Sequence, residues 1–333
     1  MSRTDLLLAG DIGGTKANLV LVDPAGDPRR PLYAERIPTA DHPSLEALLD
    51  AFLAKAGHAA TTACLGIPSP VIDGHVAPVN IHWQAQEQTV ARHLGLRRVR
   101  FLNDLVATAL GIPELSDNEL VVLHAGAPRI NGVKAIIAPG TGLGTGWLAH
   151  QGEHGTEWEA YPSEGGHAEF APRGALQRRL LAHMATGDQQ VIVESVCSGR
   201  GIANLWRFFG SEGLRDSPAV EAAAAAAADP TPVVMAAAHD LQANPRAAAA
   251  ADEFVAILFQ VAGNTALRWL ATGGVYLAGG VSPKVLPWLR RPAALAAYLA
   301  SPTLSRVLRE TPLLVVLNEQ TAVLGAFAGG RTL

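Results

Sequence analysis

The sequence contains two segments with the same pattern, in which a short apolar run is followed by a glycine-rich turn and a second extended apolar run. The first turn is Asp11-Ile12-Gly13-Gly14-Thr15, and the second is the stretch 139–146, which contains four glycines. A strand on each side of a tight turn predicts a β-hairpin, whereas Rossmann and P-loop proteins have a helix after their glycines. Because the hairpin recurs in the second half, we expect two related domains that face each other across a cleft.

The first glycine turn is a candidate phosphate-binding site. Glycine reaches backbone angles that are closed to other residues, so the amides of Gly13 and Gly14 can approach a phosphate at close range. The turn is not a P-loop, because Thr15 stands at the second glycine of that motif and no hydroxyl residue follows Lys16. In such a hairpin, Asp11 is a candidate ligand of Mg²⁺ through water.

Between the two hairpins, the run 99–102 ends on an amide and a carboxylate, Asn103 and Asp104, and a helical pattern follows over 105–111. We therefore expect both side chains at a strand-to-helix junction, where open α/β sheets have their active sites. Phosphoryl transfer needs one base that accepts the hydroxyl proton, and Asp104 is the candidate. The alternative is that Asp104 only caps the helix.

Composition excludes several classes of protein. The chain has 333 residues, 49% of them hydrophobic, which suits two domains rather than one. Its net charge of −4 gives no basic surface for nucleic acid or an anionic membrane, so we expect a small-molecule partner. Two cysteines are too few for a disulfide framework, and the stretch from Met1 to Asp5 gives no signal peptide. We expect a cytoplasmic protein.

Taken together, the motifs resemble those of the bacterial glucokinases, which belong to the hexokinase and actin-like ATPase superfamily. They occur in the family's order and span nearly the whole chain. The residues that carry the resemblance are Gly10 to Thr15, Phe101 to Asp104, Gly140 to Gly144, Pro162 to His167, Glu194 with Ser198-Gly199, and Ala278 to Gly280.

The resemblance implies an α/β fold of two actin-like (ribonuclease H-like) domains, with mixed sheets flanked by helices and an active-site cleft between them. The small domain would take residues 1–110 and 318–333, and the large domain residues 111–317. The implied reaction transfers the γ-phosphate of ATP, with Mg²⁺, to the C6 hydroxyl of D-glucose. A homodimer is implied as well.

The resemblance also assigns roles to individual residues. Asp104 would take the proton from the C6 hydroxyl. The residues that would bind the sugar are Asn103, Asp104, Glu164, His167 and Glu194, with Pro68 and Asn80 as a wall of its pocket. Those that would bind ATP are Asp11, Gly13, Gly14, Thr15, Lys16, Gly140, Thr141 and Gly142 at the phosphates, and Gly279 and Gly280 at adenosine. Two positions depart from the family: Lys16 replaces a frequent asparagine, and Arg200 replaces the usual proline after Ser198-Gly199.

Several alternatives stay open at this point. Glu164 and His167 have the spacing of a metal pair on a helix, although Gly165 and Gly166 between them disfavour a helix. His167 could be a structural histidine, and Glu164 with Asp104 could be a glycosidase pair that leaves the glycine turns unexplained. The chain could also be a kinase of another hexose or donor, or a non-catalytic sugar-sensing regulator. A DNA-binding regulator would need a basic module that the sequence lacks.

Overall fold

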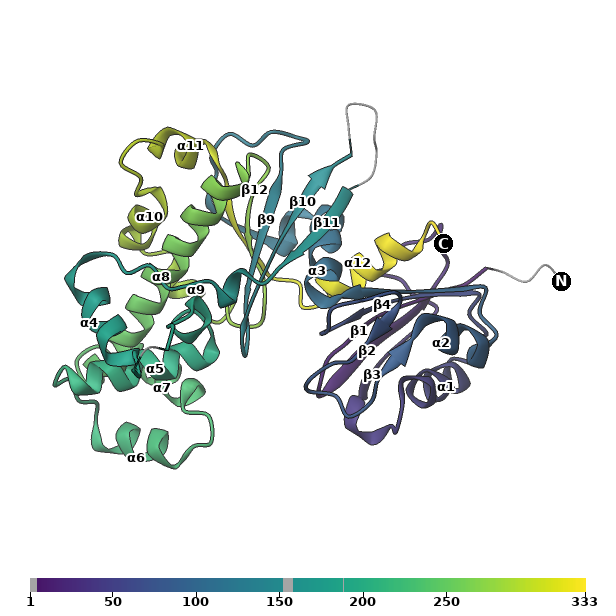
Figure 1. The fold of residues 1–333 in the computed structure, drawn as a ribbon, viewed down its shortest axis with the longest axis horizontal. Helices are drawn as coiled ribbons and strands as arrows, with labels where there is room; N and C mark the ends of the chain where they lie inside the picture. The colour runs from purple at the N-terminus through teal and green to yellow at the C-terminus, as the bar shows by residue number, and fades with distance from the viewer. Residues whose placement is uncertain (1–4, 152–157, 188) are drawn as a thin grey trace. The chain divides into compact units, whose positions relative to one another are not determined.

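The computed structural model describes residues 5–151, 158–187 and 189–333, so most of the stretch from Met1 to Asp5 lies outside it. The chain divides into two compact units (Figure 1). The first comprises Met1–Glu119, Gln151–Pro162 and Asn318–Leu333, and the second comprises Leu120–His150 and Ser163–Leu317. Among the described residues, no helix is long and apolar enough to cross a membrane.

The first unit is built on a five-stranded sheet of order β3-β2-β1-β4-β7. Its strands are β1 Leu7–Ile12, β2 Lys16–Val22, β3 Tyr33–Pro38, β4 Thr62–Ile67 and β7 Arg98–Asn103. β2 is antiparallel to β1 and β3, whereas β4 is parallel to β1 and β7. The predicted first hairpin is thus confirmed as β1–β2, with Asp11 paired to Asn18.

Helices cover both faces of this sheet, because side chains alternate between the faces along each strand. Leu6 and Leu8 pack with the cluster that contains α1 and α2, whereas Leu7 and Ala9 pack with α3 and α12. The helices are α1 Leu45–Ala56, α2 Glu87–Leu94, α3 Asp104–Gly111 and α12 Thr321–Gly330. Ser44 is the N-cap of α1, since the Ala47 amide donates to Ser44 Oγ at 3.2 Å. A small sheet pairs β5 His75–Val76 with β6 Ala85–Gln86.

α3 and α12 lie side by side with their backbones in contact (Figure 1). A Cβ atom added at Gly325 of α12 would lie 1.7 Å from the carbonyl oxygen of Ala107. One added at Gly111 of α3 would lie 2.0 Å from the carbonyl oxygen of Thr321. Only glycine permits this approach at both positions, and it fixes the helix that begins with Asp104.

The second unit contains a sheet of order β11-β10-β9-β12-β13-β8. Its strands are β8 Leu120–His124, β9 Lys134–Pro139, β10 Leu143–His150, β11 Trp158–Ser163, β12 Gly274–Leu277 and β13 Leu313–Val316. The predicted second hairpin is confirmed as the antiparallel pair β9–β10. The edge strand β11 was not predicted, because a glutamate, a proline and a serine interrupt its apolar pattern. Of its residues, only Ser163 clusters with this unit.

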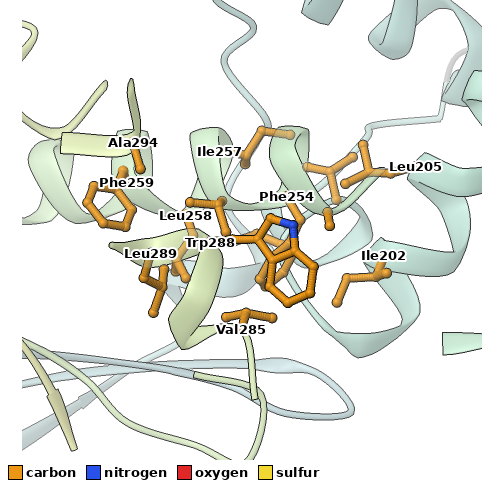
Figure 2. Packing of buried hydrophobic residues seen from close by; sticks show 14 of the residues in the cluster. Ile202, Leu205, Phe254, Ile257, Leu258, Phe259, Val285, Trp288, Leu289 and Ala294 are labelled. Carbon is orange, nitrogen blue, oxygen red and sulfur yellow. The ribbon is translucent and has the colours of Figure 1, made fainter. Parts of the chain in front are cut away.

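Helices make up most of the second unit. They are α4 Gly174–Met184, α5 Gly199–Ser211, α6 Pro218–Ala226, α7 Thr231–Ala237, α8 Pro245–Trp269, α9 Leu286–Leu289, α10 Pro292–Leu299 and α11 Ser305–Glu310. Prolines interrupt the alanine-rich region of the chain, since Pro230 precedes α7 and Pro245 begins α8. α8 runs through the core, where Phe254 and Leu258 pack around the buried indole of Trp288 (Figure 2).

Short 3-10 helices complete the chain trace: η1 Thr39–Asp41, η2 Ile112–Glu114, η3 Asp117–Glu119, η4 Gly165–His167 and η5 Val193–Ser195. Glu119, at the end of η3, is the last residue before the chain enters the second unit. Its carboxylate accepts hydrogen bonds from Ser116, from Arg29 and from Asn318, the residue at which the chain returns. Burial alone raises the pKa of Glu119, but these hydrogen bonds outweigh burial and lower the pKa from 4.5 to about 2.

This carboxylate is expected to stabilise the protein in a pH-dependent way. Because its pKa is lower in the folded than in the unfolded chain, the stabilisation is present above pH 4.5 and is lost as the pH falls toward about 2. Glu119→Gln should therefore lower the unfolding free energy at pH 7 by about 1 kcal/mol, a value discounted for solvent screening of its 17% exposed side chain.

Urea denaturation at pH 7 and pH 3 measures this effect. The difference between the natural protein and Glu119→Gln should shrink at pH 3. Glu310→Gln is the matched control, because Glu310 pairs with Arg306 on the surface and its side chain is 54% exposed. An equal loss for Glu119→Gln at both pH values would contradict the expectation.

Candidate active site

The turn of the first hairpin exposes two neighbouring backbone amides. The Gly13 amide donates to Lys16 O at 2.9 Å, and the hydroxyl and amide of Thr39 donate to Gly13 O and Thr15 O at 2.7 and 3.0 Å. No acceptor for the amides of Gly14 and Thr15 is found in the described part of the chain. The buried Thr39, which sequence reasoning missed, thus donates hydrogen bonds to two carbonyl oxygens of the turn. The amides of Gly14 and Thr15 stay available to a ligand.

Asp11 lies at the end of β1, beside this turn. Burial raises the pKa of its carboxyl, while the hydrogen bond with Asn18 and the charge of Lys16 act in the opposite direction. The described residues contain no group of three or more His, Cys, Asp or Glu side chains that could hold a metal ion. A lone carboxylate suits Mg²⁺, which keeps several waters and takes further oxygens from phosphates. Asp11 therefore fits the expected role.

Asn103 and Asp104 lie at the predicted strand-to-helix junction, between β7 and α3. Asn103 is the N-cap of α3, and its Oδ1 accepts hydrogen bonds from the amides of Leu105 and Val106 at 3.0 and 3.4 Å. Asp104 is therefore the first helical residue rather than the cap. Its Oδ1 accepts from the Leu105 amide at 2.9 Å. The Asp104 side chain thus lies at the N-terminal end of α3.

Pro68 and Asn80, which were predicted to form a wall of the sugar pocket, lie near Asn103 and near the turn of the first hairpin within the first unit. The Asn103 Nδ2 atom donates to Ser69 O at 3.4 Å, which connects Asn103 with the loop that contains Pro68. A Cβ added at Gly14 would lie 3.1 Å from Asn80 O, so Asn80 borders the turn of the first hairpin. The structure thus places Pro68 near Asn103 and Asn80 near the hairpin.

The turn of the second hairpin resembles the first in its free amides. Gly140 N donates to Gly142 O, and Gly199 N at the start of α5 donates to Gly140 O, both at 2.8 Å. No acceptor for the amides of Thr141 and Gly142 is found among the described residues. Gly279 borders this turn with φ +74°, and a Cβ there would lie 2.6 Å from Pro139 O. Gly280 has open space on its side-chain face.

Glu194 lies against the second turn. Its Oε2 accepts from the Leu143 amide and its Oε1 from Arg200 Nη2, each at 2.8 Å. A Cβ at Gly142 would lie 2.4 Å from Oε2, so a larger residue there would displace the Glu194 carboxylate. The side chain of Glu194 is 15% exposed. Both carboxylate oxygens of Glu194, a predicted sugar-binding residue, therefore already have hydrogen-bond donors, the Leu143 amide and Arg200.

Glu164 and His167 lie together on η4. Glu164 Oε2 and His167 Nδ1 are 3.5 Å apart, and both side chains are exposed, by 81% and 61%. The Gly165 amide donates to Thr145 Oγ1 at 3.1 Å, which fastens this segment to β10. The two glycines allow a single 3-10 turn and no α-helix. Both side chains are therefore accessible to a polar ligand.

Comparison with known proteins gives a consistent result. The sequence model of the family described as Glucokinase matches residues 8–332. A glucokinase of a Nostoc species is 34% identical over 338 residues, which covers 96% of this chain and 97% of that protein. The crystal structure of a glucokinase from an Antarctic psychrotroph has a TM-score of 0.84 and 26% identity, and covers 98% of both chains. A ROK family glucokinase from Streptomyces griseus, in complex with glucose and AMPPNP, has a TM-score of 0.64 and 22% identity, covering 98% of this chain and 99% of that chain.

Proposed function

This chain belongs to the glucokinase family, and on that basis we propose that it transfers the γ-phosphate of ATP to the C6 hydroxyl of D-glucose. The products are glucose 6-phosphate and ADP. The observation that carries this proposal is the pair of hairpin turns, each of which leaves two successive backbone amides without an acceptor in the described part of the chain. Such amides bind phosphate oxygens, which suits a reaction that depends on positioning and electrostatics.

The phosphate groups are assigned to both turns. In the first, the ligands are Gly13, Gly14, Thr15 and Lys16, and in the second they are Gly140, Thr141 and Gly142. Asp11 would hold Mg²⁺ through water, and the ion would supply positive charge that neutralises part of the phosphate charge. Gly279 and Gly280 let the backbone approach adenosine closely, which the open space beside Gly280 supports.

Asp104 is the proposed general base. It accepts the proton of the C6 hydroxyl while the C6 oxygen bonds to the γ-phosphorus. The bond from that phosphorus to the bridging oxygen breaks, and ADP leaves with the electron pair. Asn103 donates a hydrogen bond to the sugar, and Glu164, His167 and Glu194 bind hydroxyls near the anomeric carbon. Pro68 and Asn80 border the sugar. The exposed pair on η4 supports this assignment, because carboxylate and imidazole groups both bind hydroxyls.

Two further points belong to the proposal. The protein acts as a homodimer, and it works in the cytoplasm. Both rest on the resemblance to bacterial glucokinases.

A coupled assay for glucose 6-phosphate with the purified protein, ATP, Mg²⁺ and D-glucose tests the proposal. Product is expected, and EDTA should abolish it until Mg²⁺ is restored. Mannose, fructose and glucosamine are assayed as acceptors, and ADP and polyphosphate as donors. Product from one of these but not from glucose and ATP would identify a different kinase. Glucose binding in calorimetry without any product would indicate a sugar-sensing protein instead.

A further inference from the structure

Arg200, the second residue of α5, connects two parts of the second glycine turn. Its Nε donates to Thr141 O at 3.2 Å, and its Nη2 donates to Glu194 Oε1 at 2.8 Å. The other oxygen of Glu194 accepts from the Leu143 amide at 2.8 Å. The guanidinium group therefore binds the turn directly at the carbonyl oxygen of Thr141. It also binds Glu194, whose carboxylate accepts from the Leu143 amide at the end of the turn.

The carbonyl contacts determine which way the free amides point. In a trans peptide the C=O of one residue and the N–H of the next point in opposite directions, and the described residues contain no cis peptide. Because Arg200 binds Thr141 O, the N–H of Gly142 is directed away from α5. Gly199 N binds Gly140 O in the same way and so directs the N–H of Thr141. The first turn of α5 thus orients both amides that were assigned to phosphate.

The same guanidinium also neutralises a charge beside the turn. Glu194 lies so close to Gly142 that a Cβ there would be 2.4 Å from Oε2. An unpaired carboxylate at this place would repel the phosphates of a nucleotide. Arg200 sets a positive charge against it, and a 68% exposed side chain leaves the guanidinium accessible from solvent.

We propose that Arg200 is a positioning residue of the nucleotide site, which orients the Gly142 amide toward phosphate and neutralises Glu194 beside it. This inference rests on the proposed function, because it takes the ligand of the turn to be a nucleoside triphosphate. Loss of Arg200 is expected to weaken nucleotide binding more than sugar binding, because Glu194, the proposed sugar ligand, keeps its hydrogen bond from the Leu143 amide when Arg200 is removed.

The test compares Arg200→Gln and Arg200→Lys with the natural protein. Arg200→Gln is expected to raise KM for ATP and Kd for AMPPNP about tenfold, the usual weight of charge-assisted hydrogen bonds. KM for glucose should stay within about twofold. Arg200→Lys restores the charge but not the planar fork of donors, so it should recover about half of the loss on a logarithmic scale. Arg207→Gln is the control, because Arg207 lies on the same helix and bonds only to Asn204 among the described residues.

The outcomes separate this inference from the proposed function. If calorimetry shows that the natural protein does not bind AMPPNP, the proposed function fails and this inference fails with it. If the natural protein binds AMPPNP and Arg200→Gln binds it equally well, only the role of Arg200 is overturned. A rise in KM for glucose with unchanged AMPPNP affinity would likewise overturn it, as would an equal effect of Arg207→Gln.

Discussion

Asp104→Asn is expected to lower kcat for glucose phosphorylation at least about a hundredfold, the usual contribution of a positioned base. Asparagine has the same shape, and its Oδ1 still accepts from the Leu105 amide, so the start of α3 is kept. What is lost is the negative charge that, in the proposed mechanism, accepts the C6 proton. KM for glucose should therefore change by less than about threefold, because most contacts with the sugar are unaffected.

Steady-state kinetics with varied glucose and saturating ATP measure the two parameters. Asp117→Asn is the matched control, because Asp117 is an exposed aspartate of η3 and has no assigned role. Glucose binding by calorimetry shows that the variant is folded and competent to bind. A turnover within about threefold of the natural protein would remove Asp104 from the proposed mechanism.

Gly325→Ala is expected to lower the unfolding free energy by about 3 kcal/mol, the upper end of the usual cost of overpacking. The added methyl group would overlap the carbonyl oxygen of Ala107 at 1.7 Å, and a backbone atom inside a helix cannot move aside. α12 must therefore shift away from α3. Because Asp104 begins α3, the variant that remains folded should also lose activity.

Gly329→Ala in the same helix is the control for this experiment. Its Cβ would meet only side-chain atoms, of which the nearest is Leu102 Cδ1 at 3.2 Å. Side chains can adjust, and alanine is about 1 kcal/mol more favourable than glycine inside a helix. The net change in the unfolding free energy should therefore be small. Thermal unfolding of both variants gives the comparison. Similar stability losses for the two variants would show that the backbone contact at Gly325 is not what limits the packing.

Much of the fold could be predicted because its signals are local. Each hairpin has its apolar runs and its glycines within one short segment, and both were confirmed, as was the junction at Asp104. The predicted actin-like fold class is confirmed as well by the similarity to known sugar kinases. At 198–201 the two glycines of the sequence favour a turn, but the structure differs there. Ser198 instead caps α5, and Gly201 is needed because a Cβ there would lie 2.6 Å from the backbone of Val196.

The candidate site was less predictable for a different reason. Sequence patterns placed Asp104 on a junction, but they gave no sign that Arg200 and Glu194 would both hold the second glycine turn. The hydrogen bond between Leu143 and Glu194 joins residues 51 positions apart, and the periodicity of apolar residues in the sequence cannot predict a contact over that separation. Arg200 was visible only as a departure from the family pattern. The roles of the individual site residues stay predictions until the variants are measured.

The position of α12 has a consequence for how the protein is made. Val323, Ala326 and Phe327 of this helix complete the cluster that covers Leu7 and Cys64 of the first unit. Translation produces the second unit between α3 and α12. A nascent chain therefore holds an apolar sheet face that only α3 covers until the second unit has been synthesised, and exposed apolar surfaces bind chaperones or aggregate. The first unit to begin synthesis is thus the last to close its core.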